Sequence, residues 1–269
     1  MISLSDLRKF KAEGRKFSCL TCYDASMAKA MEAAEIDTIL VGDSLGMTIQ
    51  GCDSTLPVTV QDMAYHTAAV RRGNQHAFIL TDLPFMSYAT LNDALAGAKQ
   101  VMQAGAHMVK MEGGAWLAET VQVLTRNGIP VCVHLGLTPQ SVHVFGGYKV
   151  QARTREAADQ LIADCKAVVE AGAAVLLLEC VPAQVGKEIS ELFPHTPVIG
   201  IGAGAETDGQ VLVVQDMLGL TGGHVAKFVR NFMKEQAGAT AILDAFKAYH
   251  AAVKEGSFPA KEQTFQVEL

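Results

Sequence analysis

The sequence predicts a single domain of the α/β class, a (β/α)8 TIM barrel, and three observations favour it. The chain has 269 residues, 49% of them apolar, which is enough to bury the core of one large domain. Eight short runs rich in Val, Ile and Leu are typical of parallel strands buried on both faces. Longer amphipathic segments alternate with these runs, which favours a closed barrel; an open doubly wound sheet is the alternative.

The N-terminal segment predicts a helix and no targeting signal. Ser5 precedes Asp6 and Leu7 and has the character of a helix N-cap. No apolar stretch with a small-residue cleavage site follows it, so we expect no signal peptide. No apolar run reaches the ~18 residues that a membrane-spanning helix needs. We therefore expect a cytoplasmic protein.

The strands and helices are expected at defined positions along the chain. The predicted strands are Ser18–Cys22, Thr38–Val41, Phe78–Thr81, Met108–Met111, Val131–His134, Val175–Glu179, Val198–Ile201 and Val211–Val214, the last being the weakest pattern. Amphipathic helices are expected over Asp93–Ala104, Ala115–Arg126 and Glu156–Ala171. Gly105 and Gly172 follow helical segments and predict left-handed C-caps there.

The C-terminal segment predicts an addition to the barrel. The residues after Gly223 have a helical pattern through Tyr249 and then become polar and irregular. We expect residues 1–269 to form one barrel domain with an N-terminal helix and a helical C-terminal extension.

Six cysteines and the charge distribution exclude several classes of protein. Cys19 and Cys22 have a spacing found in redox and zinc sites, but on a strand residues three apart face opposite ways. We expect free thiols packed in a reducing cytoplasm. The net charge is −6 with both signs interspersed, and no basic stripe indicates a nucleic-acid surface.

Ionisable residues follow five successive strands, and the carboxyl ends of barrel strands face the active site. These residues are Asp43, Asp82, Lys110 with Glu112, His134 and Glu179. A buried carboxylate costs several kcal/mol unless it is paired or binds a metal. Four carboxylates at one end of the barrel therefore predict a bound cation.

Each of these residues also has a structural interpretation. Asp43 and Asp82 could cap the helices that follow them. Lys110 and Glu112 share one face of a strand and could form a plain ion pair. Their occurrence together at successive strand ends favours the metal site.

The oxygen ligands of Asp43, Asp82 and Glu112 favour Mg²⁺. His134 could bind Zn²⁺ or Co²⁺, but its strand is expected farther round the barrel, and such a histidine more commonly contacts substrate or solvent. A metal beside Lys110 could chelate a 2-oxo acid and act as a Lewis acid.

Glu179 ends an apolar strand, and burial should raise its pKa toward the range of a general base. It would then remove a proton next to the ketone; the alternative is a structural pair with Arg or Lys.

Two glycine-rich loops give weaker signals. Residues 200–205 fit a relaxed dinucleotide fingerprint, but no helix is expected to open after them, so a loop at the barrel mouth is favoured. Residues 145–149 could close over a substrate or form a surface turn.

Eight motifs between Thr21 and Gly223 resemble, in order, those of the ketopantoate hydroxymethyltransferase family. They are LVGDSLGM, QGCDSTLPVTVQDMAYHTAAVRRG, TDLPFMSYAT, VKMEGG, HLGLTPQSV, FGGYKVQ, LLLECVP and GIGAG. The resemblance implies a barrel of the phosphoenolpyruvate/pyruvate type. It also implies hydroxymethyl transfer from 5,10-methylenetetrahydrofolate to 3-methyl-2-oxobutanoate, giving 2-dehydropantoate for pantothenate and coenzyme A synthesis.

The resemblance assigns roles to matched residues. The metal ligands would be Asp43, Asp82 and Glu112, binding one Mg²⁺ per subunit. Ser44 and Lys110 would contact the substrate together with the two metal-bound aspartates, and Glu179 would accept the proton. Family members form large homo-oligomers, often decamers, which makes a homodecamer the expected assembly. The match departs at Ala152, where the family pattern has Gly. Glycine permits backbone angles that alanine resists, so this loop could have another conformation than in the family.

Two other functions would fit parts of this pattern. A metal-dependent lyase for a phosphorylated or dicarboxylic oxo acid would need similar strand ends, with an added Cys or Arg at the mouth. A barrel kept as a binding or assembly scaffold would tend to lose its acids, and all of the expected ones are present.

Overall fold

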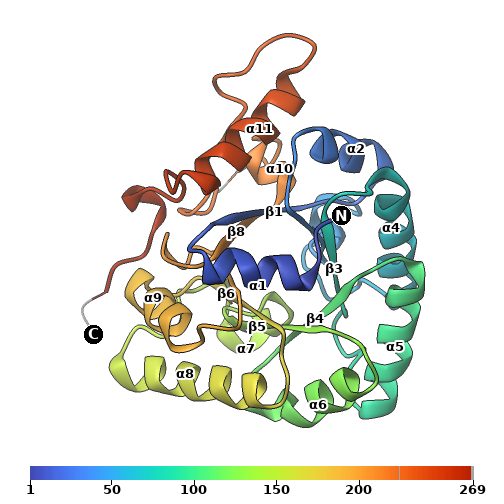
Figure 1. Cartoon of the computed structure of the whole chain (residues 1–269), viewed down its shortest axis with the longest axis vertical. Helices are drawn as coiled ribbons and strands as arrows, with labels where there is room; N and C mark the ends of the chain where they lie inside the picture. The colour runs from blue at the N-terminus through green and yellow to red at the C-terminus, as the bar shows by residue number, and fades with distance from the viewer. Residues whose placement is uncertain (224, 268–269) are drawn as a thin grey trace.

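The computed structural model describes residues 1–223 and 225–267 and contains a closed parallel barrel (Figure 1). Each strand pairs with the next one in the chain, and β1 pairs with β8. The strands are β1 (Phe17–Thr21), β2 (Thr38–Val41), β3 (Phe78–Asp82), β4 (Met108–Glu112), β5 (Val131–Gly136), β6 (Val175–Glu179), β7 (Val198–Ile201) and β8 (Gly209–Leu212). This order confirms the (β/α)8 prediction and excludes the open sheet.

Helices surround the barrel and connect its strands (Figure 1). The longer ones are α1 (Leu4–Ala12), α2 (Ala25–Ala33), α4 (Val60–Gly73), α5 (Leu91–Ala104), α6 (Ala118–Arg126), α8 (Arg155–Glu170), α9 (Ala183–Leu192) and α11 (Ala241–Lys254). Short helices are α3 (Leu45–Thr48), α7 (Val142–Phe145) and α10 (Val214–Met217), with 3-10 turns at Ala115–Leu117, Pro139–Ser141 and Lys261–Gln263. Gly105 has the left-handed φ of 118° predicted for a C-cap.

The structure corrects the prediction for β8. We predicted Val211–Val214, whereas the strand covers Gly209–Leu212. The apolar run continues past the strand end because Val214 begins α10, and its N–H donates to Thr21 Oγ1 at 2.9 Å. Apolar composition alone therefore does not locate the end of this strand.

The N-cap of α1 is Ser3, and the prediction of Ser5 was wrong. The Ser3 hydroxyl accepts a hydrogen bond from the Asp6 N–H, and the Asp6 carboxylate accepts one from the Ser3 N–H at 2.9 Å. This reciprocal pair is a capping box, in which two otherwise unpaired backbone donors are satisfied. Ser5 lies inside the first turn.

The segment after Gly223 is not the continuous helix that its periodicity predicted. In the described residues, helix begins only at Ala241, in α11. Phe228 packs against Gly202, whereas Phe232 lies in the core against Tyr249 and Phe258. The apolar residues thus contact different elements, and this packing overrides the helical pattern.

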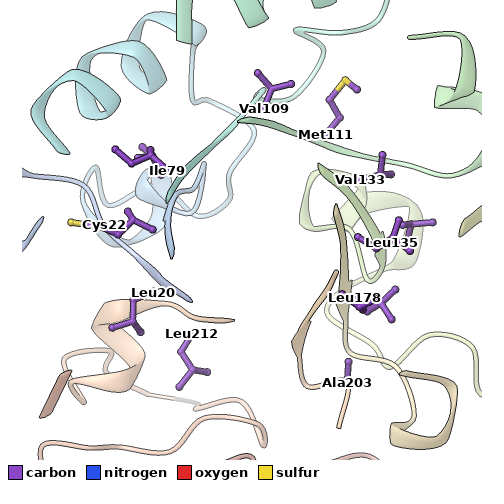
Figure 2. Packing of buried hydrophobic residues seen from close by; sticks show 14 of the residues in the cluster. Leu20, Cys22, Ile79, Val109, Met111, Val133, Leu135, Leu178, Ala203 and Leu212 are labelled. Carbon is purple, nitrogen blue, oxygen red and sulfur yellow. The ribbon is translucent and has the colours of Figure 1, made fainter. Parts of the chain in front are cut away.

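Alternating side chains of the strands divide the core into two layers. Outward residues such as Ile79, Val109 and Val133 pack under the surrounding helices (Figure 2). Inward residues fill the barrel, and Leu7 and Phe10 of α1 join them. Figure 1 shows α1 lying across the end of the barrel at which the strands begin. Helix α1 therefore closes the amino-terminal end of the barrel.

Helix α11 is joined to the barrel by polar and apolar contacts. It packs against β1 and α2, and the Tyr249 hydroxyl lies within hydrogen-bond distance of the carbonyls of Cys19 and Gln210, at 2.9 and 2.8 Å. From these contacts we propose that residues 1–269 form a single domain. No helix of the described residues is long and apolar enough to cross a membrane.

The cysteines are free thiols, as predicted. Cys19 faces the barrel interior and Cys22 the outer layer, so their sulfur atoms diverge. Burial raises the pKa of each of these two thiols to about 12. Both are therefore protonated at neutral pH and poor nucleophiles.

Candidate active site

A cavity of about 1150 Å³ opens at the carboxyl ends of the strands. The residues that the sequence placed at these ends all line it: Asp43, Ser44, Asp82, Lys110, Glu112, His134 and Glu179. All except Ser44 and Glu179 are buried. The structure thus brings the predicted site residues together.

Strand register explains why these side chains meet. Side chains alternate along β4. Lys110 and Glu112 point into the barrel, whereas Val109 and Met111 point outward. Lys110 is paired in register with Asp82 on β3, and Glu112 with His134 on β5. Neighbours in register on a parallel sheet face the same side. The charged pairs therefore form one layer, the floor of the cavity, which lies above the apolar residues that fill the barrel.

Lys110 is the centre of this layer. Its Nζ lies 2.7 Å from Asp82 Oδ1, 3.2 Å from His134 Nδ1 and 3.8 Å from Glu112 Oε1. Burial opposes the charged form, but the attraction of Asp82 and Glu112 outweighs it and raises the pKa of Lys110. The ammonium is therefore fully charged at neutral pH. The sequence allowed Lys110 and Glu112 to form a plain ion pair or to serve as a cation and a metal ligand. The ion pair is observed, and a role of Glu112 as a metal ligand stays a prediction.

His134 is closer to the acids than the sequence suggested. We expected its strand to lie farther round the barrel, but β5 adjoins β4, and His134 Nδ1 is 3.3 Å from Glu112 Oε1. Its Nε2 lies 3.3 Å from Glu179 Oε2, without an aligned hydrogen bond. Burial and Lys110 oppose protonation of the ring, yet Glu112 and Glu179 prevail and raise the pKa of His134. His134 thus connects the buried cluster to Glu179.

Neither Asp43 nor Asp82 caps a helix. The N-cap of α3 is Ser44 and that of α5 is Thr90. Instead, Asp82 Oδ2 accepts a hydrogen bond from the Asp43 N–H at 2.9 Å. Burial, followed by repulsion from Asp82 and Glu112, raises the pKa of Asp43 well above its usual value. The capping alternative is therefore excluded.

Gln140 organises the site, and the sequence analysis missed it. Its amide Nε2 donates to Asp43 Oδ2 at 2.8 Å, and its backbone N–H donates to Glu112 Oε2 at 2.9 Å. Its Oε1 accepts from the hydroxyl of Tyr88 at 2.5 Å. In the sequence, only its place in the motif HLGLTPQSV indicated a function for Gln140. A neutral amide is not recognised by charge, as the ionisable residues at the strand ends are.

Ser44 and Tyr148 lie at the rim of the cavity. The Ser44 hydroxyl is 2.8 Å from the hydroxyl of Tyr23. Tyr148, in the loop after α7, is half-exposed and contacts Met47 Sδ through its hydroxyl at 3.5 Å. This loop bridges the mouth from β5 to α3, and closure over a substrate stays a prediction.

The acids have the chemistry of a Mg²⁺ site without its arrangement. In the described residues, no three His, Cys, Asp or Glu side chains converge so as to hold a metal ion as they stand. Yet Asp43, Asp82 and Glu112 are all buried at one cavity, and the set offers carboxylate oxygens only. Hard cations prefer such ligands. The residues therefore fit Mg²⁺ once Asp82 exchanges its contact with Lys110.

The departure at Ala152 falls where the backbone favours glycine. Ala152 has a left-handed φ of 52°, and Cys180, beside Glu179, has one of 48°. The two segments are joined, because the Gln151 N–H donates to the Cys180 carbonyl at 2.8 Å. A residue with a Cβ pays about 1–2 kcal/mol for this conformation. The loop thus keeps the geometry that glycine would adopt.

The glycine-rich segment after β7 is a loop that leaves the carboxyl end of that strand, as predicted. No helix follows it before β8 begins at Gly209, which excludes a dinucleotide site. At Gly202 a Cβ would meet the rings of Phe228 and Phe265, at 2.8 and 3.1 Å. Glycine here makes room for two aromatic side chains.

Comparisons with known proteins agree on one family. The family model described as ketopantoate hydroxymethyltransferase matches residues 1–261. A 3-methyl-2-oxobutanoate hydroxymethyltransferase of Acinetobacter baumannii is 88% identical over 100% of both chains. One from Psychrobacter sp. is 59% identical over 98% of this chain and 100% of its own.

Solved structures show the same fold at low identity. A phosphonopyruvate hydrolase has a TM-score of 0.62 at 13% identity, covering 82% of this chain and 84% of its own. A 2,3-dimethylmalate lyase of the PEP mutase/isocitrate lyase superfamily has a TM-score of 0.59 at 16% identity, covering 79% and 81%. These similarities confirm the predicted barrel type.

Proposed function

The chain belongs to the ketopantoate hydroxymethyltransferase family, and we propose which residues at the mouth of its barrel bind the metal, bind the substrate and transfer the proton. The enzyme transfers a hydroxymethyl group from 5,10-methylenetetrahydrofolate to 3-methyl-2-oxobutanoate, giving 2-dehydropantoate in pantothenate biosynthesis.

Asp43, Asp82 and Glu112 would hold one Mg²⁺ per subunit. The observation that carries this assignment is the burial of all three carboxylates side by side at one cavity. Three buried carboxylates face one lysine, which leaves two negative charges when His134 is neutral, and a divalent cation would balance them. When bound, Mg²⁺ supplies a Lewis acid that polarises the keto group of the substrate.

Lys110 and Ser44 would hold the carboxylate end of the oxo acid. The charge on Lys110 is secured by its acidic neighbours, as its raised pKa indicates. A charged donor in a buried site binds a carboxylate more strongly than a neutral one. Ser44 offers a hydroxyl whose partner, Tyr23, fixes its direction.

Glu179 would remove the proton from C3 of the oxo acid. It is 14% exposed, less buried than the cluster, so it can contact substrate in the cavity. His134, 3.3 Å from its carboxylate, would position Glu179 and share its proton. The C3 carbanion would then form a bond to the one-carbon unit, whose two bonds to the folate nitrogens break. Water supplies the hydroxyl group, and the C3 proton and the second water proton go to the folate nitrogens, which leaves tetrahydrofolate.

Proton exchange tests this division of labour. Incubating the protein with Mg²⁺, 3-methyl-2-oxobutanoate and deuterium oxide should replace the C3 proton by deuterium without any folate. Glu179→Gln keeps the shape of the side chain but cannot accept the proton, so exchange should fall by about 10²–10⁴-fold. The matched control is Glu188→Gln on α9, which should exchange like the wild type.

Two results would contradict the assignment. Exchange at the wild-type rate in Glu179→Gln would remove Glu179 as the base. Unchanged exchange after complete chelation of divalent ions would remove the metal from the enolisation step.

We further propose, from the family resemblance, a homodecamer in the cytoplasm. Sedimentation or light scattering of the purified chain would measure its assembly, and a monomer would contradict the proposal.

A further inference from the structure

Part of the cavity is left unexplained by the oxo acid. Pockets for drug-sized ligands are ~300–1,000 Å³, and this one, at about 1150 Å³, exceeds what a small oxo acid fills. The charged layer of β2–β6 occupies its floor. A second wall is formed by α10 and by the segments around Phe228 and Phe265. No residue of this wall has a role in the steps described above.

The α10 side of this wall has one hydrogen-bond acceptor without a donor and, next to it, a carboxylate without a cation. Gln215 Oε1 is buried and lacks a hydrogen-bond partner among the described residues. The next residue, Asp216, is partly buried, and burial raises the pKa of its carboxyl group. Thr221 Oγ1 donates to Asp216 Oδ1, and within the described chain no cation pairs with this carboxylate. A buried acceptor is costly unless a ligand or water donates to it, so a ligand with N–H donors would suit this side of the wall.

The other side of the wall is aromatic. Phe228 and Phe265 both pack on Gly202, and both line the cavity. The Ala183 N–H donates to the Phe265 carbonyl at 2.8 Å, which fixes the C-terminal segment against α9. Half-buried rings held in this way offer flat surfaces for a planar ligand.

We propose that this wall binds the pterin ring of the folate co-substrate, with Gln215 Oε1 and the Asp216 carboxylate accepting from its N3–H and 2-amino groups. The ring would lie against Phe228 and Phe265. The pyrimidine edge of a pterin presents two adjacent N–H donors, and an amide oxygen and a carboxylate that line the same cavity can accept from them. This inference rests on the proposed function, because the oxo acid must occupy the charged floor.

Two variants separate a binding role from a structural one. Gln215→Met removes the unpaired acceptor at similar volume, so the thermal midpoint should stay equal or rise. The KM for 5,10-methylenetetrahydrofolate should rise by about tenfold or more. Asp216→Asn should raise the same KM by a similar factor. In both variants the KM for the oxo acid and the folate-independent deuterium exchange should stay within about twofold of the wild type.

Asp53→Asn is the matched control, because Asp53 lines the same cavity away from this wall and loses the same charge. Its KM for the folate should not change. Wild-type KM for the folate in Gln215→Met and Asp216→Asn would overturn the pterin site. An equal rise in all three variants would do so as well, since it would indicate a general effect of cavity charge. Absence of exchange in the wild type would instead overturn the proposed division of labour and leave the folate KM as the test of this wall.

Discussion

At the scale of single residues, the site depends on a neutral side chain as much as on its charges. Gln140 connects Asp43 to Glu112 through its amide and backbone N–H groups, and Tyr88 holds the other end of the amide. Partners of metal ligands fix the ligand geometry. The proposed Mg²⁺ affinity should therefore depend on Gln140.

Gln140→Met should raise the Mg²⁺ concentration that gives half-maximal activity by about 10–100-fold. The reason is that Asp43 loses its donor while the backbone contact to Glu112 remains. Activity measured against Mg²⁺ concentration tests this, with Gln160→Met on the surface of α8 as the control. An unchanged midpoint in Gln140→Met would show that Gln140 does not orient the ligands.

Ala152 gives a second prediction at this scale. Ala152→Gly should stabilise the protein by about 0.5–1 kcal/mol, because relief of the left-handed φ exceeds the extra chain entropy of glycine. Denaturant unfolding measures the difference. Ala163→Gly, at an exposed position within helix α8, should instead lose about 1 kcal/mol. Loss of stability in both variants would contradict the strain at Ala152.

At the scale of elements, α1 depends on a cap that the sequence allowed at two positions. Ser3→Ala removes the hydroxyl of the capping box and should destabilise the protein by about 1 kcal/mol. Ser5→Ala, within the helix, should change stability by less than about 0.5 kcal/mol. Chemical denaturation of the two variants compares the predicted and the observed cap. A larger loss in Ser5→Ala would contradict the observed helix start.

The sequence predicted strands better than it predicted irregular segments. Runs such as Val175–Glu179 have no competing structure, and alternation within β4 places Lys110 and Glu112 on one face. The segment after Gly223 has apolar residues at helical spacing, yet Phe228 and Phe232 pack against different parts of the molecule. Which partner each residue meets is a long-range property, so local periodicity could not reveal it.

The residues of the site were likewise predictable where they follow a strand and carry a charge, and not elsewhere. Charged residues at strand ends were visible, because the closed barrel brings all such ends together. The adjacency of His134 and Glu112 follows from strand order, which is known only once the barrel is established. Gln140 acts through hydrogen bonds that no charge reveals, and only its place in a family motif pointed to it.

At the scale of the whole molecule, the proposed Mg²⁺ site should couple metal binding to folding. A metal that binds only the folded state stabilises it by about 2.7 kcal/mol at a concentration of 100 times its Kd. Saturating Mg²⁺ should thus raise the Tm of the wild type by several degrees, roughly 2–4 °C per kcal/mol. Asp43→Asn, which removes one proposed ligand, should be folded without Mg²⁺ and show little further rise. Equal Mg²⁺-dependent shifts in the two proteins would contradict the ligand assignment.

Closure of the barrel by α1 also has a kinetic consequence. Leu7 and Phe10 fill the amino-terminal end, so the charged floor is reached from the carboxyl-terminal mouth. If the folate binds to the wall between this floor and solvent, the bound folate blocks the access of the oxo acid to its site. The two substrates would then enter in a fixed sequence, the acid first and the folate second. The products would leave in reverse, with 2-dehydropantoate retained until the spent folate has gone.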